Sequence, residues 1–189
     1  MSPTNSNTLC EKYPLIFADQ YTDPTSTLTH WGFECGDGWF HIIDCLCLNI
    51  QSHINWGVQE HNRAVQYNTM ISDAKTGNWS TFDEYYKHVE GKYRDKYKEI
   101  TLSAEVRPIL DPVSQVVAVQ IKEKFGTLRF YYNGGDETIQ GMVRMAESMS
   151  AVTCETCGSP GKLRRGGWLQ TLCDRHQEEY QKTQHEFDE

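Results

Sequence analysis

Several features that would identify a function are missing from this chain of 189 residues. No apolar run is long enough to span a membrane, and the polar first residues lack the hydrophobic centre of a signal peptide. Neither a Walker phosphate loop nor a Gly-x-Ser-x-Gly nucleophile motif occurs, so we predict no catalytic residue. The formal net charge of −8 disfavours nonspecific binding to nucleic acid or anionic membranes. We therefore expect a cytoplasmic protein without a membrane partner.

Cysteine, by contrast, is plentiful, and seven cysteines in a cytosolic protein indicate metal ligands and free thiols instead of disulfides. Cys154 and Cys157 form a Cys-x2-Cys pair, and Cys173 and His176 form a Cys-x2-His pair after a gap of fifteen residues. These are the ligand types, number and spacing of a closed tetrahedral zinc site. A closed site has no open coordination position, so we predict a structural Zn²⁺ that takes no part in catalysis.

The residues around these ligands predict a treble-clef-like or zinc-ribbon-like module. Gly158 suits a tight turn around a metal, and residues 161–172 are typical of two short strands around an Arg165-Gly166-Gly167 turn. A helix over 174–185 would place the second ligand pair at its first turn. The predicted organisation is an irregular N-terminal segment (1–30), an α+β domain (31–152) and a zinc-binding module with a C-terminal helix (153–189).

Hydrophobic periodicity predicts the elements of the α+β domain. Four helices are expected, over residues 39–50, 58–75, about 80–99 and about 137–149. Asp37 in the Gly36-Asp37-Gly38 turn is a natural N-cap for the first of them, and we interpret this turn as structural. Residues 116–124 and 128–132 predict an antiparallel β-hairpin around Phe125-Gly126, so the fold class is α+β.

One face of this hairpin is the main candidate for ligand binding. A two- or four-residue loop places Val119 opposite Tyr132 on an apolar face and Lys122 opposite Arg129 on a polar face. Like charges directly opposite each other are destabilising, so we expect a compensating carboxylate of the protein, an acidic group of a partner or a phosphate. With tryptophans available for stacking, the candidate ligand-binding residues are Trp31, Trp39, Lys122, Lys124, Arg129 and Tyr131.

A second basic group surrounds the predicted zinc ligands: Lys162, Arg164, Arg165 and Arg175. Basic zinc modules often contact phosphates, so nucleic acid is an alternative partner. The acidic C-terminal residues would instead neutralise these cations within the chain: Glu178, Glu179, Glu186, Asp188 and Glu189.

Three stretches resemble an uncharacterised family of bacteriophage and prophage proteins: residues 31–40 (WGFECGDGWF), 122–130 (KEKFGTLRF) and the zinc segment 154–176. The resemblance implies a phage setting and no known activity. In that setting we expect an accessory binding protein that counters a host defence by binding a host protein or an anionic nucleotide-like signal. The alternatives are a nucleic-acid-binding regulator that uses the basic zinc module, and a nucleotide-processing enzyme.

Overall fold

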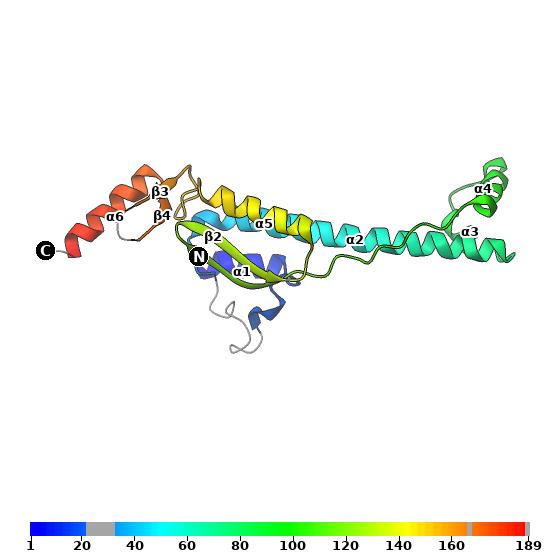
Figure 1. The fold of residues 1–189 in the computed structure, drawn as a ribbon, viewed down its shortest axis with the longest axis horizontal. Helices are drawn as coiled ribbons and strands as arrows, with labels where there is room; N and C mark the ends of the chain where they lie inside the picture. The colour runs from blue at the N-terminus through cyan, green and yellow to red at the C-terminus, as the bar shows by residue number, and fades with distance from the viewer. Residues whose placement is uncertain (22–32, 166–167, 188–189) are drawn as a thin grey trace. The chain divides into compact units, whose positions relative to one another are not determined.

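The structure, a computed structural model, describes residues 1–21, 33–165 and 168–187 (Figure 1). It confirms the α+β class, because its helices accompany two separate antiparallel sheets of two strands each.

The chain divides into two compact units, and the division differs from the expected one at residues 30 and 152. The first unit combines Met1–Ile54 with Val113–Glu189, and the second is Asn55–Pro112. The zinc segment belongs to the first unit, where Glu155 O accepts a hydrogen bond from Gly38 N of the turn at residues 36–38 and the Thr171 hydroxyl donates one to Gly126 O of the hairpin.

The N-terminus is helical, so the expectation of an irregular segment is wrong for residues 3–12. Helix α1 (Pro3–Lys12) starts after Ser2, whose hydroxyl accepts a hydrogen bond from Asn5 N at 3.4 Å. A serine N-cap followed by proline is a strong helix start, and it outweighs the polar composition that indicated a loop. A short 3-10 helix, η1 (Ala18–Tyr21), follows, and the rest of the predicted irregular segment lies outside the described residues.

The predicted hairpin is present as β1 (Val117–Lys124) and β2 (Thr127–Asn133). Phe125 and Gly126 form a two-residue turn, both with positive φ (54° and 79°), as a type I′ turn requires. The predicted pair of Lys122 and Arg129 is confirmed. The predicted pair of Val119 and Tyr132 is wrong, because a bulge between Ala118 and Gln120 places Ala118 opposite Tyr132.

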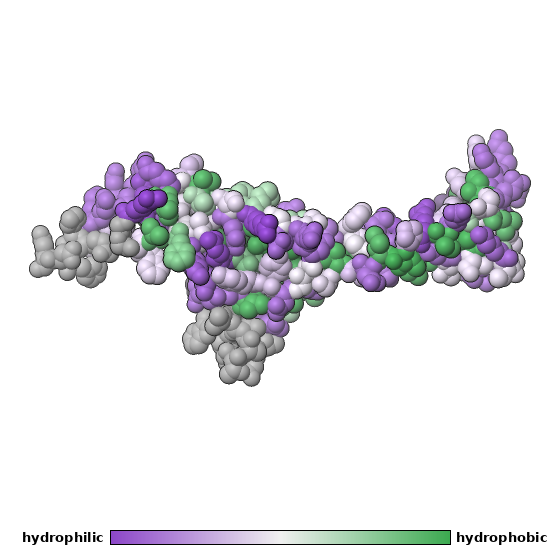
Figure 2. Space-filling view, in the orientation of Figure 1, coloured by the Kyte–Doolittle hydropathy of each residue, from purple (hydrophilic) through white to green (hydrophobic). Residues whose placement is uncertain are grey.

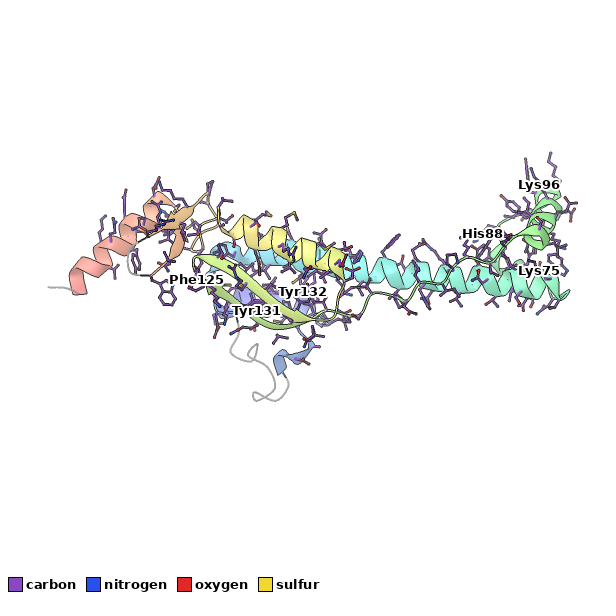
Figure 3. All side chains as sticks on the ribbon, viewed as in Figure 1. Lys75, His88, Lys96, Phe125, Tyr131 and Tyr132 are labelled. Carbon is purple, nitrogen blue, oxygen red and sulfur yellow. The ribbon has the colours of Figure 1, made fainter. Side chains whose placement is uncertain are left out.

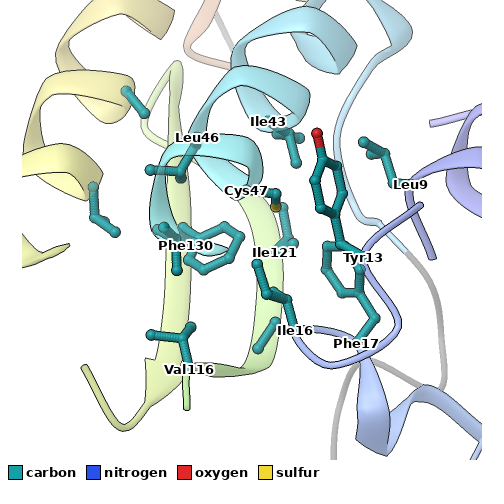
Figure 4. Close-up of a cluster of buried hydrophobic side chains, with 14 of the residues drawn as sticks. Leu9, Tyr13, Ile16, Phe17, Ile43, Leu46, Cys47, Val116, Ile121 and Phe130 are labelled. Carbon is teal, nitrogen blue, oxygen red and sulfur yellow. The ribbon is translucent and has the colours of Figure 1, made fainter. Parts of the chain in front are cut away.

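The hydrophobic core of the first unit lies among α1, the hairpin, the first half of α2 (Phe40–Lys75) and α5 (Glu137–Ser150). Figure 4 shows Tyr13 and Ile16 from the N-terminal segment beside Ile43 and Leu46 of α2 and Phe130 of β2. Asp136 caps α5 by accepting a hydrogen bond from Ile139 N. Short 3-10 helix η3 (Asp37–Trp39) leads into α2.

Helix α2 is continuous where two helices were expected. Gly57 lies in its interior. A glycine there costs about 1 kcal/mol relative to alanine, but it removes no backbone hydrogen bond as proline would, so the helix continues.

The second unit contains the rest of α2, α3 (Ser80–Tyr85) and α4 (Lys92–Ser103) around a small core of Met70, Ile71 and Phe82. One helix was expected over residues 80–99. It is interrupted because Gly91 adopts φ 61°, outside the helical region. The chain then runs alongside α2, where Asn68 and Arg107 exchange two hydrogen bonds of 2.8 Å.

The C-terminal module has the predicted order of a turn, two short strands and a helix. Its elements are β3 (Lys162–Arg164), β4 (Gln170–Leu172) and α6 (Asp174–Phe187). Gly166 and Gly167 of the expected turn lie outside the described residues.

Candidate metal centre and adjoining pocket

The structure brings the four predicted metal ligands together. One ligand atom from each of Cys154, Cys157, Cys173 and His176 lies within 4.8 Å of all the others. Nδ1 of His176 is 3.4 Å from Cys154 Sγ and 3.3 Å from Cys173 Sγ, and the sulfurs of Cys157 and Cys173 are 3.9 Å apart. These four side chains could bind one metal ion.

The separations agree with tetrahedral zinc coordination. Bonds of about 2.3 Å to sulfur and about 2.0 Å to nitrogen place two sulfurs about 3.8 Å apart and a sulfur and a nitrogen about 3.5 Å apart. A disulfide requires about 2.05 Å, and none of the seven cysteines, all of them among the described residues, forms a disulfide. Four protein ligands leave no coordination position for a substrate, so the geometry fits a metal that holds the fold together.

Local backbone structure positions the ligands. In the first pair, Cys154 N donates to Ser159 O and Gly158 N donates to Cys154 O, both at 2.8 Å. Gly158 has φ +76°, which only glycine adopts without strain. In the second pair, Cys173 O accepts from Gln177 N at 3.0 Å, so this pair stands at the first turn of α6. The N-terminal end of a helix favours thiolates there.

The electrostatics of the ligands differ along the cluster. Hydrogen bonds from the side chain and backbone of Ser159 lower the pKa of the Cys157 thiol to about 6. Burial raises the pKa of the Cys154 thiol, and a bound cation would favour its thiolate. Nε2 of His176 lies 3.2 Å from Nη2 of Arg175 and 3.6 Å from Oε2 of Glu179, while Nδ1 faces the sulfurs of Cys154 and Cys173.

Glu155, inside the first ligand pair, joins this module to the turn before α2. Its carbonyl accepts from Gly38 N at 2.7 Å, its Oε1 accepts from Gly36 N at 2.9 Å, and its backbone N donates to Thr171 O at 2.9 Å. A Cβ on Gly36 or Gly38 would lie 2.3 Å or 2.2 Å from a carbonyl oxygen of the module. The two glycines are therefore needed for close approach, and burial of Glu155 raises the pKa of its carboxyl.

The structure separates Trp39 from the proposed ligand site. Trp39 has no exposed surface, and its Nε1 donates to Thr153 O at 2.9 Å. Its ring is part of the core and offers no face to a ligand. Trp31 lies outside the described residues. Asp37 is no side-chain cap for η3; its carboxylate accepts from Ser2 N at 2.7 Å.

The four hairpin residues do share one face of the sheet. Lys122 pairs with Arg129, its Nζ lies 5.6 Å from the centre of the Tyr131 ring, and Lys124 lies nearest the turn. Arg129 donates to Thr127 Oγ1 and to Leu128 O, both at 2.7 Å. Within the described part of the chain, none of these three cations forms an ion pair, so a carboxylate of the protein, one of the three possibilities left open by the sequence, does not pair with them there. Figure 3 labels Tyr131 on β2 and Phe125 at the turn.

A pocket of about 400 Å³ adjoins this face, and its lining residues are Lys122, Glu123, Lys124, Phe125, Trp168 and Leu169. Sequence reasoning named only the two lysines as site residues and missed the other four. The rings of Phe125 and Trp168 are 67% and 66% exposed. Figure 2 shows green side chains among purple ones where the hairpin turn meets the C-terminal module. Glu123 is engaged internally, since its Oε1 accepts from Gly126 N and its Oε2 from Trp168 Nε1.

The hairpin turn rests on the sheet of the C-terminal module, which forms the second wall of this pocket. Thr171 Oγ1 donates to Gly126 O at 2.6 Å, and a Cβ on Gly126 would lie 2.3 Å from a methyl group of Leu163. The sequence signal that could have identified Phe125 as a pocket residue was an aromatic side chain directly before glycine in the predicted hairpin turn. The approach of Trp168 depends on this long-range contact, which no local pattern reveals.

The basic residues of the C-terminal module are largely paired within it. Asp174 Oδ1 lies 2.6 Å from Arg164 and 3.3 Å from Lys162. Arg164 also donates to Leu172 O at 3.1 Å. Asp174, at the start of α6, is thus the carboxylate that pairs with Lys162 and Arg164.

No family model, curated protein or solved structure matches the chain, so the resemblance to phage proteins remains a prediction. Among the residues placed by the structure, no helix combines the length and apolar character needed to cross a membrane.

Proposed function

We propose that this protein is a non-enzymatic accessory binding protein that is held together by a structural zinc ion and binds an anionic nucleotide-like molecule. The binding site is the tip pocket, defined as the cavity between the Phe125-Gly126 turn and Trp168. Lys122 and Lys124 supply positive charge for phosphate, and the two exposed rings supply stacking surfaces for a base.

The observation that carries this proposal is Phe125. It is the one non-glycine residue with positive φ (54°) among the residues described, in a turn position that favours asparagine or glycine. Left-handed backbone costs a residue with a Cβ about 1–2 kcal/mol. Because 67% of its surface is exposed, burial of the ring does not offset that cost. Strain that packing does not explain concentrates at functional sites.

The role of zinc follows from its position. The four ligands leave no open site for catalysis, but they anchor the segment that provides Trp168 and the sheet under the hairpin turn. Loss of zinc would therefore disturb the tip pocket without removing a reacting group. The absence of a disulfide among the seven cysteines, all of which the structure describes, is consistent with the reducing cytoplasm of a host cell.

The test is calorimetric titration of the zinc-loaded full-length protein with nucleoside triphosphates. The corresponding nucleoside and inorganic triphosphate serve as matched part-ligands. We expect the nucleotide to bind more tightly than either part. Lys122→Ala/Lys124→Ala should weaken triphosphate and nucleotide binding, whereas Trp168→Ala should weaken nucleoside and nucleotide binding. Lys87→Ala, which changes an exposed lysine of the second unit, is the control.

Absence of binding by any nucleotide, or binding that these variants leave unchanged, would refute the nucleotide proposal. Capture of a host protein that depends on Lys122 and Lys124 would instead place the same surface in a protein interface. Native mass spectrometry of protein purified from host cells is the first step, because it reports zinc and any retained small molecule together.

The two alternatives have separate signatures. A nucleic-acid-binding regulator would bind DNA or RNA with a steep salt dependence that is lost in Arg164→Ala/Arg165→Ala. The internal pairing of Arg164 and Lys162 with Asp174 disfavours it. A nucleotide-processing enzyme would turn over the bound nucleotide. The phage setting and the role against a host defence rest on the sequence resemblance alone.

A further inference from the structure

A second cavity, of about 430 Å³, lies between the first half of α2 and α5, which run side by side in Figure 1. None of its lining residues belongs to the zinc cluster or to the tip pocket. Its walls are largely apolar, and the donor atoms along it are sulfur and imidazole nitrogen, with one amide side chain, that of Asn49. We call it the methionine groove, and its donor residues are His41, Cys45, Met142, Met145 and Met149.

Helical spacing places these donors on two facing rows. His41 and Cys45 are four residues apart on α2, and the three methionines are three and four residues apart on α5. Three of the five methionines of the chain thus line one cavity. Cys45 is exposed, and Met145 and Met149 are 61% and 48% exposed, so the donors are accessible and are not simply filling the core.

We propose that the methionine groove binds one Cu(I) ion, independently of the tip pocket. Thiolate and thioether are the ligands that select Cu(I), and imidazole also suits copper. None of the described residues lining the groove is a carboxylate, so a hard divalent cation finds no oxygen donor of that kind there. A monovalent ion with a single thiolate from Cys45 is neutral overall, which an apolar cavity tolerates better than a net charge.

Methionine is well suited to such a site because its unbranched side chain has three rotatable bonds and can bring sulfur to an ion without backbone movement. An apolar docking surface would use the same groove, but leucine would serve it equally well. Replacement of methionine by leucine keeps volume and hydrophobicity and removes the donor atom. This substitution therefore separates metal binding from apolar contact.

The experiment uses the zinc-loaded full-length protein under anaerobic conditions, with Cu(I) supplied from a competing chelator. Native mass spectrometry counts zinc and copper in each chain, and the chelator competition gives the affinity. Spectra of protein labelled with ¹³C at the methionine methyl groups identify which side chains respond. The variants are Cys45→Ser and Met145→Leu/Met149→Leu. The control is Met70→Leu, in the core of the second unit.

We expect one Cu(I) beside one retained zinc, with methyl signals of the three groove methionines shifted and that of Met70 unchanged. Replacement of a residue that only orients a metal ligand weakens metal binding by about tenfold or more. Loss of a ligand itself should weaken it at least as much. Cys45→Ser and Met145→Leu/Met149→Leu should therefore each weaken Cu(I) binding by about tenfold or more. Met70→Leu should leave it unchanged.

Three results would overturn the proposal: no uptake of Cu(I), uptake only as zinc leaves, or equal affinity in both groove variants and the parent. Cys45 is exposed, so its replacement should not unfold the chain. Retained zinc and an unchanged circular dichroism spectrum verify this for each variant. A peptide helix that binds the leucine variant as well as the parent, without any Cu(I) binding, would identify the groove as an apolar docking surface.

Discussion

Replacement of Gly38 by alanine tests the contact between the turn before α2 and the metal module. The added Cβ would lie 2.2 Å from Cys154 O, 2.5 Å from Gly158 N and 2.6 Å from Glu155 O. All three atoms belong to the backbone, so no flexible side chain can move aside. The turn and the first ligand pair must separate instead.

The magnitude follows from three terms. Overpacking against a closed structure costs about 1–3 kcal/mol, and loss of the 2.7 Å hydrogen bond from Gly38 N to Glu155 O costs about 1 kcal/mol more. Alanine restricts the unfolded chain and returns about 0.5–1 kcal/mol. We therefore expect a net loss of about 1–3.5 kcal/mol, or roughly 2–14 °C in Tm for a chain of this size.

The assay is urea unfolding followed by circular dichroism, together with zinc release to a colorimetric chelator as a probe specific to the module. Gly141→Ala is the matched control, because this helical glycine of α5 has nothing within 4 Å of the new Cβ. Helix propensity predicts that it gains about 1 kcal/mol. The same substitution should thus change stability in opposite directions at the two positions.

If Gly38→Ala matched the parent protein in both unfolding and zinc release, the module would not rest on this turn. If it destabilised the fold but left zinc release unchanged, the turn would contribute to the core without supporting the metal ligands. Only a variant that is less stable to urea and also releases zinc more readily agrees with the contact through Glu155.

Three further predictions follow from other parts of the first unit. Cys154→Ser, or removal of zinc by a chelator, should abolish equimolar zinc in elemental analysis and destabilise the C-terminal module; a folded, metal-free protein would contradict this. Asp136→Ala should cost about 0.5–2 kcal/mol at pH 7 through loss of the α5 cap. The hydrogen bond with His53 is the main cause that lowers the pKa of Asp136 below 3.8, so the Asp136 carboxylate stabilises the fold above pH 3.8. Urea unfolding at several pH values should show the stability difference between the parent and Asp136→Ala shrinking as pH falls through the folded-state pKa of Asp136. Phe125→Asn should raise stability by about 1 kcal/mol in thermal unfolding, because asparagine tolerates the left-handed turn, while weakening nucleoside binding; lower stability would mean that the ring packs more than its exposure indicates.

The metal cluster was predictable because ligand chemistry limits both residue type and spacing. Cys154, Cys157, Cys173 and His176 can be recognised from the sequence without knowledge of the fold. The register of Lys122 with Arg129 was predictable for a similar reason, since a two-residue turn sets the pairing on both strands. Local rules therefore account for the parts of the site that lie within one element or one motif.

What depends on distant contacts could not be predicted. Trp39 has the same local pattern whether its ring is buried or exposed, and only the packing of Thr153 against it decides the outcome. The bulge at Val119 shifts one strand against the other without a glycine or proline to mark it. Trp168 reaches the hairpin turn through tertiary structure alone, so the tip pocket has no signature along the chain.

The contacts of the turn before α2 also affect the order in which the chain can fold during synthesis. Gly36 and Glu155 are 119 residues apart, and Trp39 and Thr153 are 114 residues apart. Contacts this distant in sequence form late, because the ribosome must release the intervening chain first. A nascent chain that ends before residue 153 would leave the indole N–H of Trp39 without its acceptor and the two glycines without a surface to cover them. Residues 153–155 thus complete packing that Gly36 and Trp39 begin more than a hundred residues earlier.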